Sequence, residues 1–347
     1  MSDPLPPPAA ADLAHILAHS EDLWRDLRGT RLFITGATGF FGKWLLESIA
    51  VANDSLKANV RATLLTRDRE RFAQQVPRLA DRAEFEWLQG DCASFRFPAG
   101  KFEAIIHLAT PPAAELAQGG PRLAVDTLFG MQRLLDFARH AKTGRVLLAS
   151  SGAVYGWPAM GRERIDENYV GSPNPRYASS AYGEVKRMCE LLCALAPAVE
   201  TVIARGFSFV GPYLPLTDKF AVGSFMGDAL AGQPIRIRSD GSQLRSYLYA
   251  ADLALWLLVL LVRGKASEAY NVGSAEAISL GQLARELAAL AGTGCVTITD
   301  GSPPAQPVAY LPSIDKIRAE FALPDPIPLR DALRRTLLWA GSCPRSL

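Results

Sequence analysis

The chain has 347 residues, of which 49% are apolar, and its formal net charge is only +2. This length and apolar content suffice for a substantial core in one large domain or two ordinary ones. The composition excludes an intrinsically disordered chain, and the near balance of charges argues against a nucleic-acid-binding protein.

The N-terminal segment shows no export signal. Residues 1–10 are rich in proline and lack the positive start and apolar core of a secretory peptide. Residues 11–27 predict an amphipathic helix before the first strand, with a role in packing or in dimer formation rather than in catalysis. The five cysteines are odd in number and lack metal-ligand spacing, which indicates a reducing compartment. We therefore expect a cytoplasmic protein without a metal site, in which Cys189 and Cys193 belong to the core.

A glycine-rich turn follows the first predicted strand, residues 31–35. Gly36, Gly39 and Gly42 form a Gly-x-x-Gly-x-x-Gly pattern that leads directly into a helical pattern over residues 43–50. Such a turn lets the backbone approach a pyrophosphate, whose charge then lies against free N–H groups at the start of the helix. The order of strand, turn and helix predicts a dinucleotide site and disfavours the alternative of an ordinary glycine turn.

The end of the second predicted strand bears on the choice of cofactor. An acidic side chain here binds the ribose hydroxyls of NAD, whereas a basic one suits the extra phosphate of NADP. Arg67 therefore favours NADP, with NAD as the second choice. The alternative is that Arg67 and Arg69 belong to a solvated helix start and that Asp68 binds the ribose.

Apolar runs alternate with amphipathic ones along the chain, which is the pattern of a parallel sheet wrapped by helices. The predicted fold class is α/β, a doubly wound parallel sheet with a smaller C-terminal α/β lobe. We expect a helical extension over 1–28, a cofactor-binding domain over 29–206 and mainly a substrate-binding lobe over 207–347. Residues 253–262 are too few to span a bilayer and predict a buried helix. The predicted strands are 31–35, 60–66, 84–89, 103–108, 145–150 and 199–205.

Two further segments carry candidate catalytic groups. Tyr182 and Lys186 are four residues apart on a predicted helix and so share one face. A neighbouring cation favours the ionised form of a phenol, which makes Tyr182 a candidate proton-transfer residue. Ser150 and Ser151 end a strand, where side chains reach the ligand crevice of a parallel sheet. Each motif alone also suits a half-buried ring beside a solvated lysine, or an ordinary turn serine.

Together these segments resemble the extended short-chain dehydrogenase/reductase family, in the branch that acts on nucleotide sugars. The resemblance runs from about Gly29 to about Ile278. It implies Ser151, Tyr182 and Lys186 as catalytic residues. It implies cofactor contacts from Tyr182 and Lys186 and from Gly36, Thr38, Gly39, Phe40, Phe41, Gly42, Arg67, Asp91, Cys92, Leu108, Ala109 and Thr110. It implies substrate contacts from Ser151, Gly152, Ser208 and Arg245, with Arg245 gripping the nucleotide diphosphate.

The resemblance also implies the chemistry and the assembly. Hydride transfer is coupled to proton transfer through Tyr182, whose pKa Lys186 lowers while it also binds the nicotinamide ribose. Ser151 polarises the reacting oxygen. A homodimer built on helices 123–142 and 181–196 is implied as well, although burial of both helices against their own sheet is the alternative.

Departures from the family pattern narrow the reaction. Sugar 4,6-dehydratases carry an acidic residue after the strand-end hydroxyls, where this chain has Gly152 and Ala153, and GDP-fucose synthase carries a cysteine where Gly152 stands. Both activities are therefore disfavoured, which leaves a nucleotide-sugar 4-ketoreductase or 4-epimerase. Ser208 and Thr127 each replace an asparagine that is common in the family, so the sugar is harder to infer.

Two other functions stay open at this point. The chain could be a non-catalytic NAD(P)-binding sensor or scaffold of the same fold, although Ser151, Tyr182 and Lys186 are all present. It could also reduce a non-sugar carbonyl, against which Arg245 in its diphosphate-binding context argues. We expect a nucleotide-sugar substrate and neither nucleic acid nor membrane as a partner.

Overall fold

The computed structural model describes residues 4–156, 164–217, 220–294, 296–298 and 308–343. Its centre is a seven-stranded sheet in the order β11-β6-β5-β4-β1-β2-β3, in which every neighbouring pair is parallel. The six predicted strands are confirmed to within one residue at each end, and the seventh comes from the C-terminal part of the chain. The strands are β1 Arg31–Thr35, β2 Arg61–Thr66, β3 Phe85–Gln89, β4 Ala104–His107, β5 Arg145–Ser151, β6 Glu200–Gly206 and β11 Glu268–Val272.

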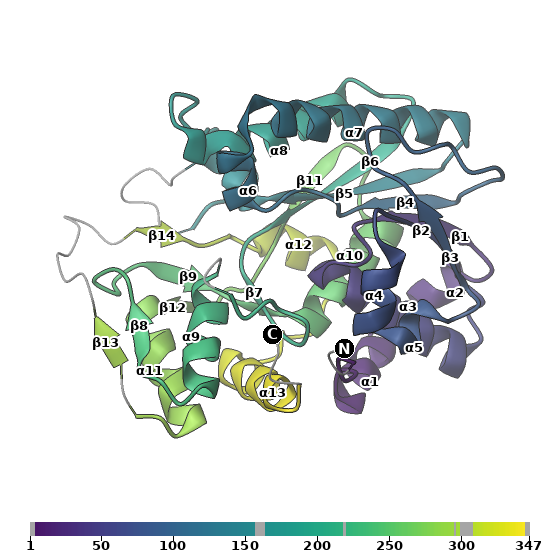
Figure 1. Cartoon of the computed structure of the whole chain (residues 1–347). Coiled ribbons are helices and arrows are strands. Elements are labelled where there is room, and N and C mark those ends of the chain that lie inside the picture. Colours follow the sequence, from purple (N-terminus) through teal and green to yellow (C-terminus); the bar gives the residue numbers. More distant parts are fainter. Residues whose placement is uncertain (1–3, 157–163, 218–219, 295, 299–307, 344–347) are drawn as a thin grey trace.

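Helices cover both faces of this sheet, which is the predicted doubly wound arrangement (Figure 1). Each face is sealed by its own apolar cluster, because the buried strands are apolar on both sides. One face carries α3 Phe40–Leu56, α4 Arg69–Gln75, α5 Pro77–Ala80 and α10 Ala250–Arg263, and the other carries α6 Ala113–Gln118, α7 Gly120–His140 and α8 Ala181–Ala194. Cys189 and Cys193 are buried within the α7–α8 face, as predicted for core residues.

Helix α10 is buried from Ala250 to Leu261. A helix that is apolar on all sides needs to be buried on all sides. Helix α10 is buried because it lies between the sheet and the N-terminal helices. The prediction of a buried helix at 253–262 is confirmed. Among the described residues, no helix has both the length and the apolar character needed to cross a membrane.

The N-terminal extension forms two short helices, α1 Ala10–Ala18 and α2 Glu21–Asp26. The prediction of one continuous helix over 11–27 is wrong, because Ser20 donates to the Ile16 carbonyl at 2.6 Å and accepts the Trp24 indole N–H at 2.8 Å at the break. Helix α1 packs against α3 and α10. Its buried Asp12 accepts a hydrogen bond from Tyr249 at 2.7 Å, so the extension is tied into the fold.

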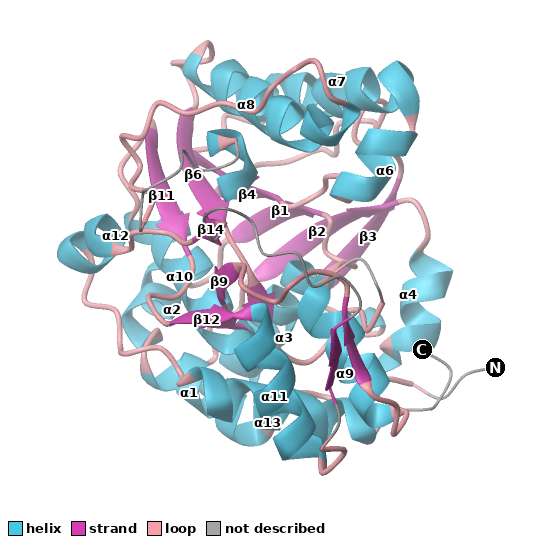
Figure 2. Ribbon diagram, turned by 90° about the vertical axis from the view of Figure 1, so that its left-hand side faces the viewer, coloured by secondary structure: helices cyan, strands magenta, loops and turns pink. Residues whose placement is uncertain are grey.

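The remaining elements build a smaller lobe beside the sheet (Figure 2). Its three-stranded sheet has the order β12-β9-β14. The chain returns from this lobe to the large sheet through α10 and β11. The boundary between the two domains at residue 206 stays a prediction. The elements are β7 Phe209–Val210, α9 Ala221–Leu230, β8 Ile235–Ile237, β9 Leu244–Ser246, β10 Leu248–Tyr249, β12 Ala277–Ser279, α11 Leu280–Ala291, β13 Val296–Ile298, β14 Ala309–Tyr310, α12 Asp315–Glu320 and α13 Leu329–Gly341.

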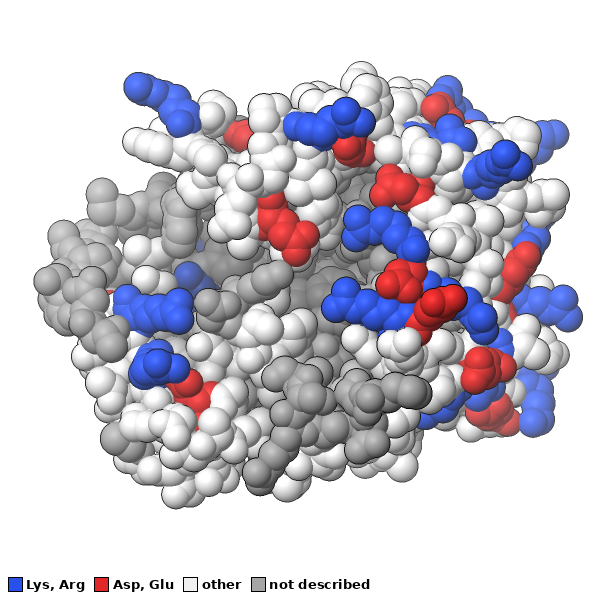
Figure 3. All heavy atoms as spheres, in the orientation of Figure 1, with Lys and Arg blue, Asp and Glu red and all other residues white. Residues whose placement is uncertain are grey.

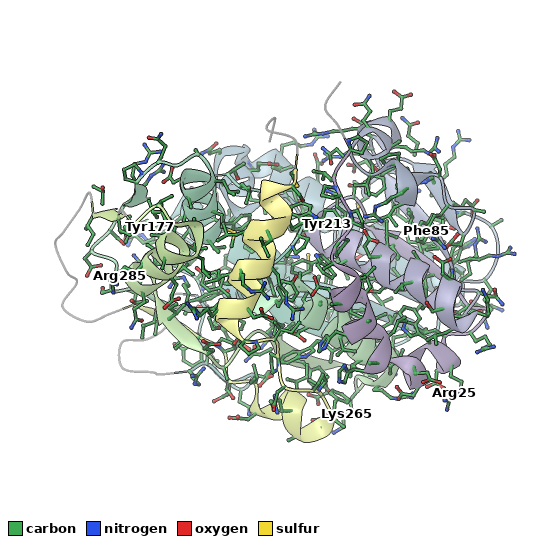
Figure 4. All side chains as sticks on the ribbon, turned by 90° about the horizontal axis from the view of Figure 1, so that it is seen from below. Arg25, Phe85, Tyr177, Tyr213, Lys265 and Arg285 are labelled. Atoms are coloured by element: carbon green, nitrogen blue, oxygen red, sulfur yellow. The ribbon has the colours of Figure 1, made fainter. Side chains whose placement is uncertain are left out.

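Tyr213 ties the two parts together beside α13 (Figure 4). Its hydroxyl meets Glu47 of α3 and Arg78 of α5, and its ring packs edge-on against Trp339 of α13, with 5.2 Å between the ring centres. Glu47 is buried and is paired with Arg78, so its charge is compensated. These contacts fix α13 against the helices below the sheet.

Charge is mixed over the surface. On the face shown in Figure 3, Lys and Arg are interspersed with Asp and Glu, and the described residues form no broad field of one sign. This face therefore lacks the basic stripe that a nucleic-acid-binding surface needs.

Candidate active site

The glycine-rich turn is shaped for close approach of the backbone. Gly36 has φ of +70°, and a Cβ added to it would lie 2.7 Å from the backbone N of Ala109. A Cβ added to Gly42 would lie 2.3 Å from the carbonyl oxygen of Ala37. No side chain fits at either position. The turn opens into α3 with Gly39 as its N-cap, so the N–H groups of the first helical turn remain free to bind a pyrophosphate.

The other predicted cofactor residues gather at the same edge of the sheet. Leu108, Ala109 and Thr110 follow β4, the neighbour of β1, and the Leu108 N–H bonds to the Thr35 carbonyl at 3.1 Å. Asp91 and Cys92 follow β3. The Cys92 thiol hydrogen-bonds to Thr35, and burial raises its pKa to about 12, so it stays neutral. The residues at this edge fit a dinucleotide cofactor.

Three cationic residues, Lys43, Arg67 and Arg71, flank the region beyond the end of β2. Arg67 is exposed after the strand, and the Asp68 carboxylate accepts the Arg71 backbone N–H at 2.9 Å, which caps α4. Burial and the nearby Arg71 lower the pKa of Lys43 on α3 to about 8. Within the described part of the chain, Lys43, Arg67 and Arg71 have no carboxylate partner. Lys43 and Arg71 were not predicted as cofactor residues, although both lie next to motifs that predicted the site.

The two serines at the end of β5 have different surroundings. Ser150 donates to Glu190 at 2.5 Å, and Glu190 is in turn bound by Arg205 at 2.7 Å. Ser151 lies within hydrogen-bonding reach of the Tyr182 phenol, and its oxygen accepts the Ala153 N–H at 3.1 Å. Ser150 is thus held in a network behind the site, and Ser151 is the hydroxyl that meets Tyr182, as the resemblance implied.

Lys186 lies over the face of the Tyr182 ring. Its Nζ is 5.9 Å from the ring centre and donates to the Ala149 carbonyl at 2.5 Å and to Thr110 Oγ1 at 2.7 Å. Burial lowers the pKa of Lys186 to about 8. The side chain is therefore aimed at the cofactor-wall residue Thr110, where it could reach a ribose.

The expected lowering of the Tyr182 pKa by Lys186 is not found. Burial raises the pKa of Tyr182 above its ordinary value, and the hydrogen bond with Ser151 opposes that rise. The physical reason is that the ammonium faces Ala149 and Thr110, so desolvation of the phenol dominates. Within the described residues, Ser151 is the group that favours ionisation of Tyr182.

The substrate side of the site is formed by Arg245 and the segment after β5. Burial lowers the pKa of Arg245, and its guanidinium donates hydrogen bonds to the Leu244 carbonyl at 2.9 Å and to Gln243 Oε1 at 3.3 Å. Among the described residues it pairs with no carboxylate, so its charge is available to an anionic ligand. Ser208 follows β6 and accepts the Leu248 N–H with its backbone carbonyl at 3.0 Å.

Two aromatic residues that were not predicted from the sequence, Phe207 and Tyr310, enclose Gly152. A Cβ added to Gly152 would lie 2.6 Å from the Tyr310 hydroxyl and 2.8 Å from the Phe207 ring. Those two rings pack together with 4.7 Å between their centres. Tyr310 lies on β14, a strand of two residues that carries too little periodicity to be predicted. Thr127 donates to the Leu123 carbonyl within α7 at 2.7 Å.

Sequence comparison finds relatives along most of the chain. The model of the NAD dependent epimerase/dehydratase family matches residues 32–273. UDP-glucuronic acid decarboxylase 1 of Xenopus tropicalis is 28% identical over 311 residues, covering 88% of this chain and 71% of the relative. UDP-glucuronic acid decarboxylase 5 of Arabidopsis thaliana is 25% identical over 336 residues, covering 96% and 93%.

Structure comparison supports the fold. An epimerase from Methanothermobacter thermautotrophicus matches with a TM-score of 0.77 at 21% identity, covering 93% of this chain and 95% of that one. The UDP-glucuronic acid 4-epimerase of Bacillus cereus, in complex with UDP-glucuronic acid and NAD, matches with a TM-score of 0.75 at 20% identity, covering 89% and 98%. Since the family model spans well over half of the chain, the protein belongs to the NAD dependent epimerase/dehydratase family.

Proposed function

We propose that this protein is an NAD(P)-dependent enzyme that transfers hydride at C4 of a nucleotide-activated sugar, as a 4-ketoreductase or a 4-epimerase. The observation that supports this most is the convergence of Ser151, Tyr182 and Lys186 at the carboxyl edge of the sheet, beside the glycine-rich turn. Arg245, a cation without a carboxylate partner among the described residues, suits the diphosphate of the substrate.

Each residue has a role that its contacts support. Tyr182 takes the proton of the C4 hydroxyl in oxidation and returns it in reduction. Ser151 donates a hydrogen bond to the reacting oxygen and holds it against Tyr182. Lys186, aimed past Thr110, binds the cofactor ribose and presents its positive charge beneath the ring. The bound nicotinamide supplies the hydride acceptor or donor.

The segment after β5 supports reduction or epimerisation over dehydration. Elimination of water needs an acid and a base close to the ketose, and Gly152 and Ala153 supply neither. The described groups that shift the pKa of Tyr182 are Ser151 and Cys189, and neither is a carboxylate.

A second candidate is decarboxylation of a nucleotide-linked uronic acid, because the curated relatives named above are UDP-glucuronic acid decarboxylases. The first step would be the same. Oxidation at C4 makes the carboxylate on C5 part of a β-keto acid; CO₂ then leaves, the electron pair stays on C5 as an enolate, and C5 takes up a proton. Tyr182 would return the C4 proton in the final reduction.

We also propose NADP as the preferred cofactor. Its extra phosphate needs cations at the end of β2, and Arg67, Arg71 and Lys43 are three cations without a carboxylate partner in the described ranges. Asp68, the carboxylate that could instead hold an NAD ribose, caps α4. Arg69, by contrast, is paired with Asp81 at 3.7 Å.

A homodimer through α7 and α8 is the assembly we propose. Both helices present large apolar side chains to solvent, and the two helices pack side by side, so the exposed residues form one face. These residues are Val125 and Phe129 on α7 and Met188, Leu191 and Leu195 at α8. A cytoplasmic location, in which the described cysteines stay free thiols, remains a prediction.

The test is a substrate panel with the purified full chain. Cofactor retained after purification is identified by mass spectrometry, and nucleotide sugars, nucleotide-linked uronic acids and their 4-keto forms are then supplied with NADP or NAD. NADPH consumption with a 4-keto sugar selects the reductase, and isomer formation without net redox change selects the epimerase. Release of CO₂ from a uronic acid selects the decarboxylase.

Tyr182→Phe is the control, because it removes the phenolic oxygen and keeps the ring. We expect it to lower kcat by about 10²-fold to 10⁴-fold while the unfolding temperature stays close to that of the wild type. Retained cofactor with no turnover of any nucleotide sugar would instead support a sensor or scaffold. Turnover of a non-sugar carbonyl alone would contradict the assignment to nucleotide sugars.

A further inference from the structure

Tyr310 brings a second phenol to the catalytic serine. It lies on β14, where it is the register partner of Arg245 on β9. Tyr310 is partly buried, and its hydroxyl lies within hydrogen-bonding reach of Ser151. Tyr182 reaches the same serine. Two phenols therefore converge on one hydroxyl group.

The hydrogen-bonding capacity of Ser151 limits how this can be arranged. A serine hydroxyl has one proton to donate and two lone pairs to accept with. The Ala153 N–H uses one lone pair at 3.1 Å. One proton and one lone pair are left for two phenols, so one phenol must donate to Ser151 while the other accepts from it.

The reaction decides which phenol donates to Ser151 and which accepts from it. Tyr182 must lose its proton before it can take one from a substrate hydroxyl, and a phenolate can only accept. We propose that Tyr310 is a positioning residue that donates a hydrogen bond to Ser151 Oγ and thereby, before substrate binds, turns the Ser151 proton toward the oxygen of Tyr182. When substrate binds, the same Ser151 proton turns to the reacting oxygen, and Tyr310 still holds the serine. This inference rests on the proposed function only in requiring Tyr182 to act as a base.

The surroundings of Tyr310 suit a donor. Burial raises the pKa of Tyr310 above its ordinary value, so the phenol keeps its proton at neutral pH. The ring is held by Phe207 at 4.7 Å between ring centres and by the Arg245 guanidinium at 5.6 Å. Gly152 leaves room for the hydroxyl, since any Cβ there would lie 2.6 Å from it.

Other charged and titratable groups face these phenols and must be kept constant. Lys186 and Cys189 face Tyr182 from α8, and Arg245, Tyr155 and Tyr182 itself act on Tyr310. None of these side chains is altered by removal of one hydroxyl from Tyr310. Because Tyr182 and Tyr310 also act on each other directly, the part of a change in Tyr182 ionisation that disappears without Ser151 reports on the contact through the serine.

The test replaces Tyr310 by Phe in the full chain. Without the donated proton, Ser151 is a weaker and less oriented donor to the phenolate, so the ionised form of Tyr182 is less favoured. We expect the acid limb of the pH profile of kcat/KM to move up by about one pH unit, which is about a tenfold loss on that limb. Gly152→Ala, which displaces the Tyr310 hydroxyl, should move it in the same direction.

A second measurement needs no substrate and so stands apart from the proposed function. Tyrosinate ultraviolet absorbance is titrated with NADP bound, and the step lost in Tyr182→Phe is assigned to Tyr182. We expect that step to move to higher pH in Tyr310→Phe. In a Ser151→Ala background, Tyr310→Phe should shift the step less, because the part that passes through the serine is lost.

The matched control is Tyr270→Phe. Tyr270 lies on β11, and its hydroxyl donates to Glu320 of α12 at 2.9 Å. This variant should leave both the acid limb and the Tyr182 titration in place. An unchanged titration in Tyr310→Phe would overturn the proposal, and so would a shift of the same size without Ser151. Failure to turn over any nucleotide sugar would refute the proposed function and leave the titration as the test of Tyr310.

Discussion

Ser150 and Ser151 are neighbours in the chain, yet Ser150 donates to Glu190 at 2.5 Å while Ser151 meets Tyr182. Successive side chains of a strand point to opposite faces, so only one of the two hydroxyls can reach the site. Arg205 binds Glu190 at 2.7 Å and balances its charge without Ser150. The pair thus offers an internal comparison between a structural and a catalytic serine.

Replacing each serine by alanine should separate the two roles. Ser151→Ala removes the donor to the reacting oxygen, and we expect kcat to fall by about 10²-fold with little change in unfolding temperature. Ser150→Ala should cost about 1 kcal/mol of stability and leave kcat close to that of the wild type. Steady-state kinetics and chemical unfolding of both variants check this. A larger kinetic loss in Ser150→Ala would reverse the assignment.

Lys186 should destabilise the fold below pH 8. Its pKa falls from 10.5 to about 8 on folding, so between these values the unfolded chain binds a proton that the folded chain lacks. Stability then rises with pH across this window and is lowest below it. We expect Lys186→Met to raise the free energy of unfolding at pH 7 by on the order of 1–3 kcal/mol, with the difference shrinking as pH approaches 10.

Urea unfolding at pH 7 and pH 10, without added cofactor, measures this difference. Lys57→Met, at an exposed lysine, is the control and should show no pH-dependent difference. The same Lys186→Met variant should be inactive, because no cation remains beneath the Tyr182 ring. A stability difference that is the same at both pH values would show that burial of the charge is not its cause.

Arg67→Glu should weaken NADP binding. A carboxylate at this position repels the extra phosphate and can accept the ribose hydroxyls of NAD. We expect the ratio of the Kd values for NADP and NAD to rise by about tenfold or more, measured by titration calorimetry. Arg69→Glu is the matched control, because Arg69 is already paired with Asp81. Equal shifts in both variants would indicate a general charge effect.

The sheet could be predicted from the sequence because its central strands are buried on both faces. Residues 31–35 and 145–150 are short apolar runs bounded by polar or glycine residues, so their limits are set by composition alone. The break between α1 and α2 was missed, because it depends on hydrogen bonds of Ser20 that periodicity does not encode.

The site could be predicted only in part. Its glycines, hydroxyl residues and basic residues follow the ends of parallel strands. These strand ends meet at one edge of the sheet, so the order of the elements in the sequence predicts that these residues lie close together. Tyr310 comes to Ser151 through the pairing of β14 with β9, two short strands far apart in the chain. The register between such strands is set by tertiary packing, so no local sequence pattern could predict that Tyr310 lies in the site.

Arg245→Ala should weaken binding of nucleotide-linked substrates. The guanidinium is half-buried and pairs with no carboxylate in the described ranges, so its charge is free for a diphosphate. We expect KM to rise by about 10-fold to 100-fold with a smaller change in kcat, the effect of losing 1–3 kcal/mol of binding. Arg236→Ala, which removes a surface arginine paired with Asp228, should leave KM unchanged. Equal KM changes in the two variants would exclude a diphosphate contact at Arg245.

Phe129→Asp should yield a monomer. Phe129 is 59% exposed on α7, and Leu191 is 49% exposed on the neighbouring α8. A charge within an apolar interface is costly to bury. We expect light scattering to give the mass of a dimer for the wild type and of a monomer for Phe129→Asp at micromolar concentration. Leu338→Asp, at an equally exposed apolar residue on α13, should stay dimeric. A dimer that survives Phe129→Asp but dissociates in Leu338→Asp would move the interface from the α7–α8 face to α13.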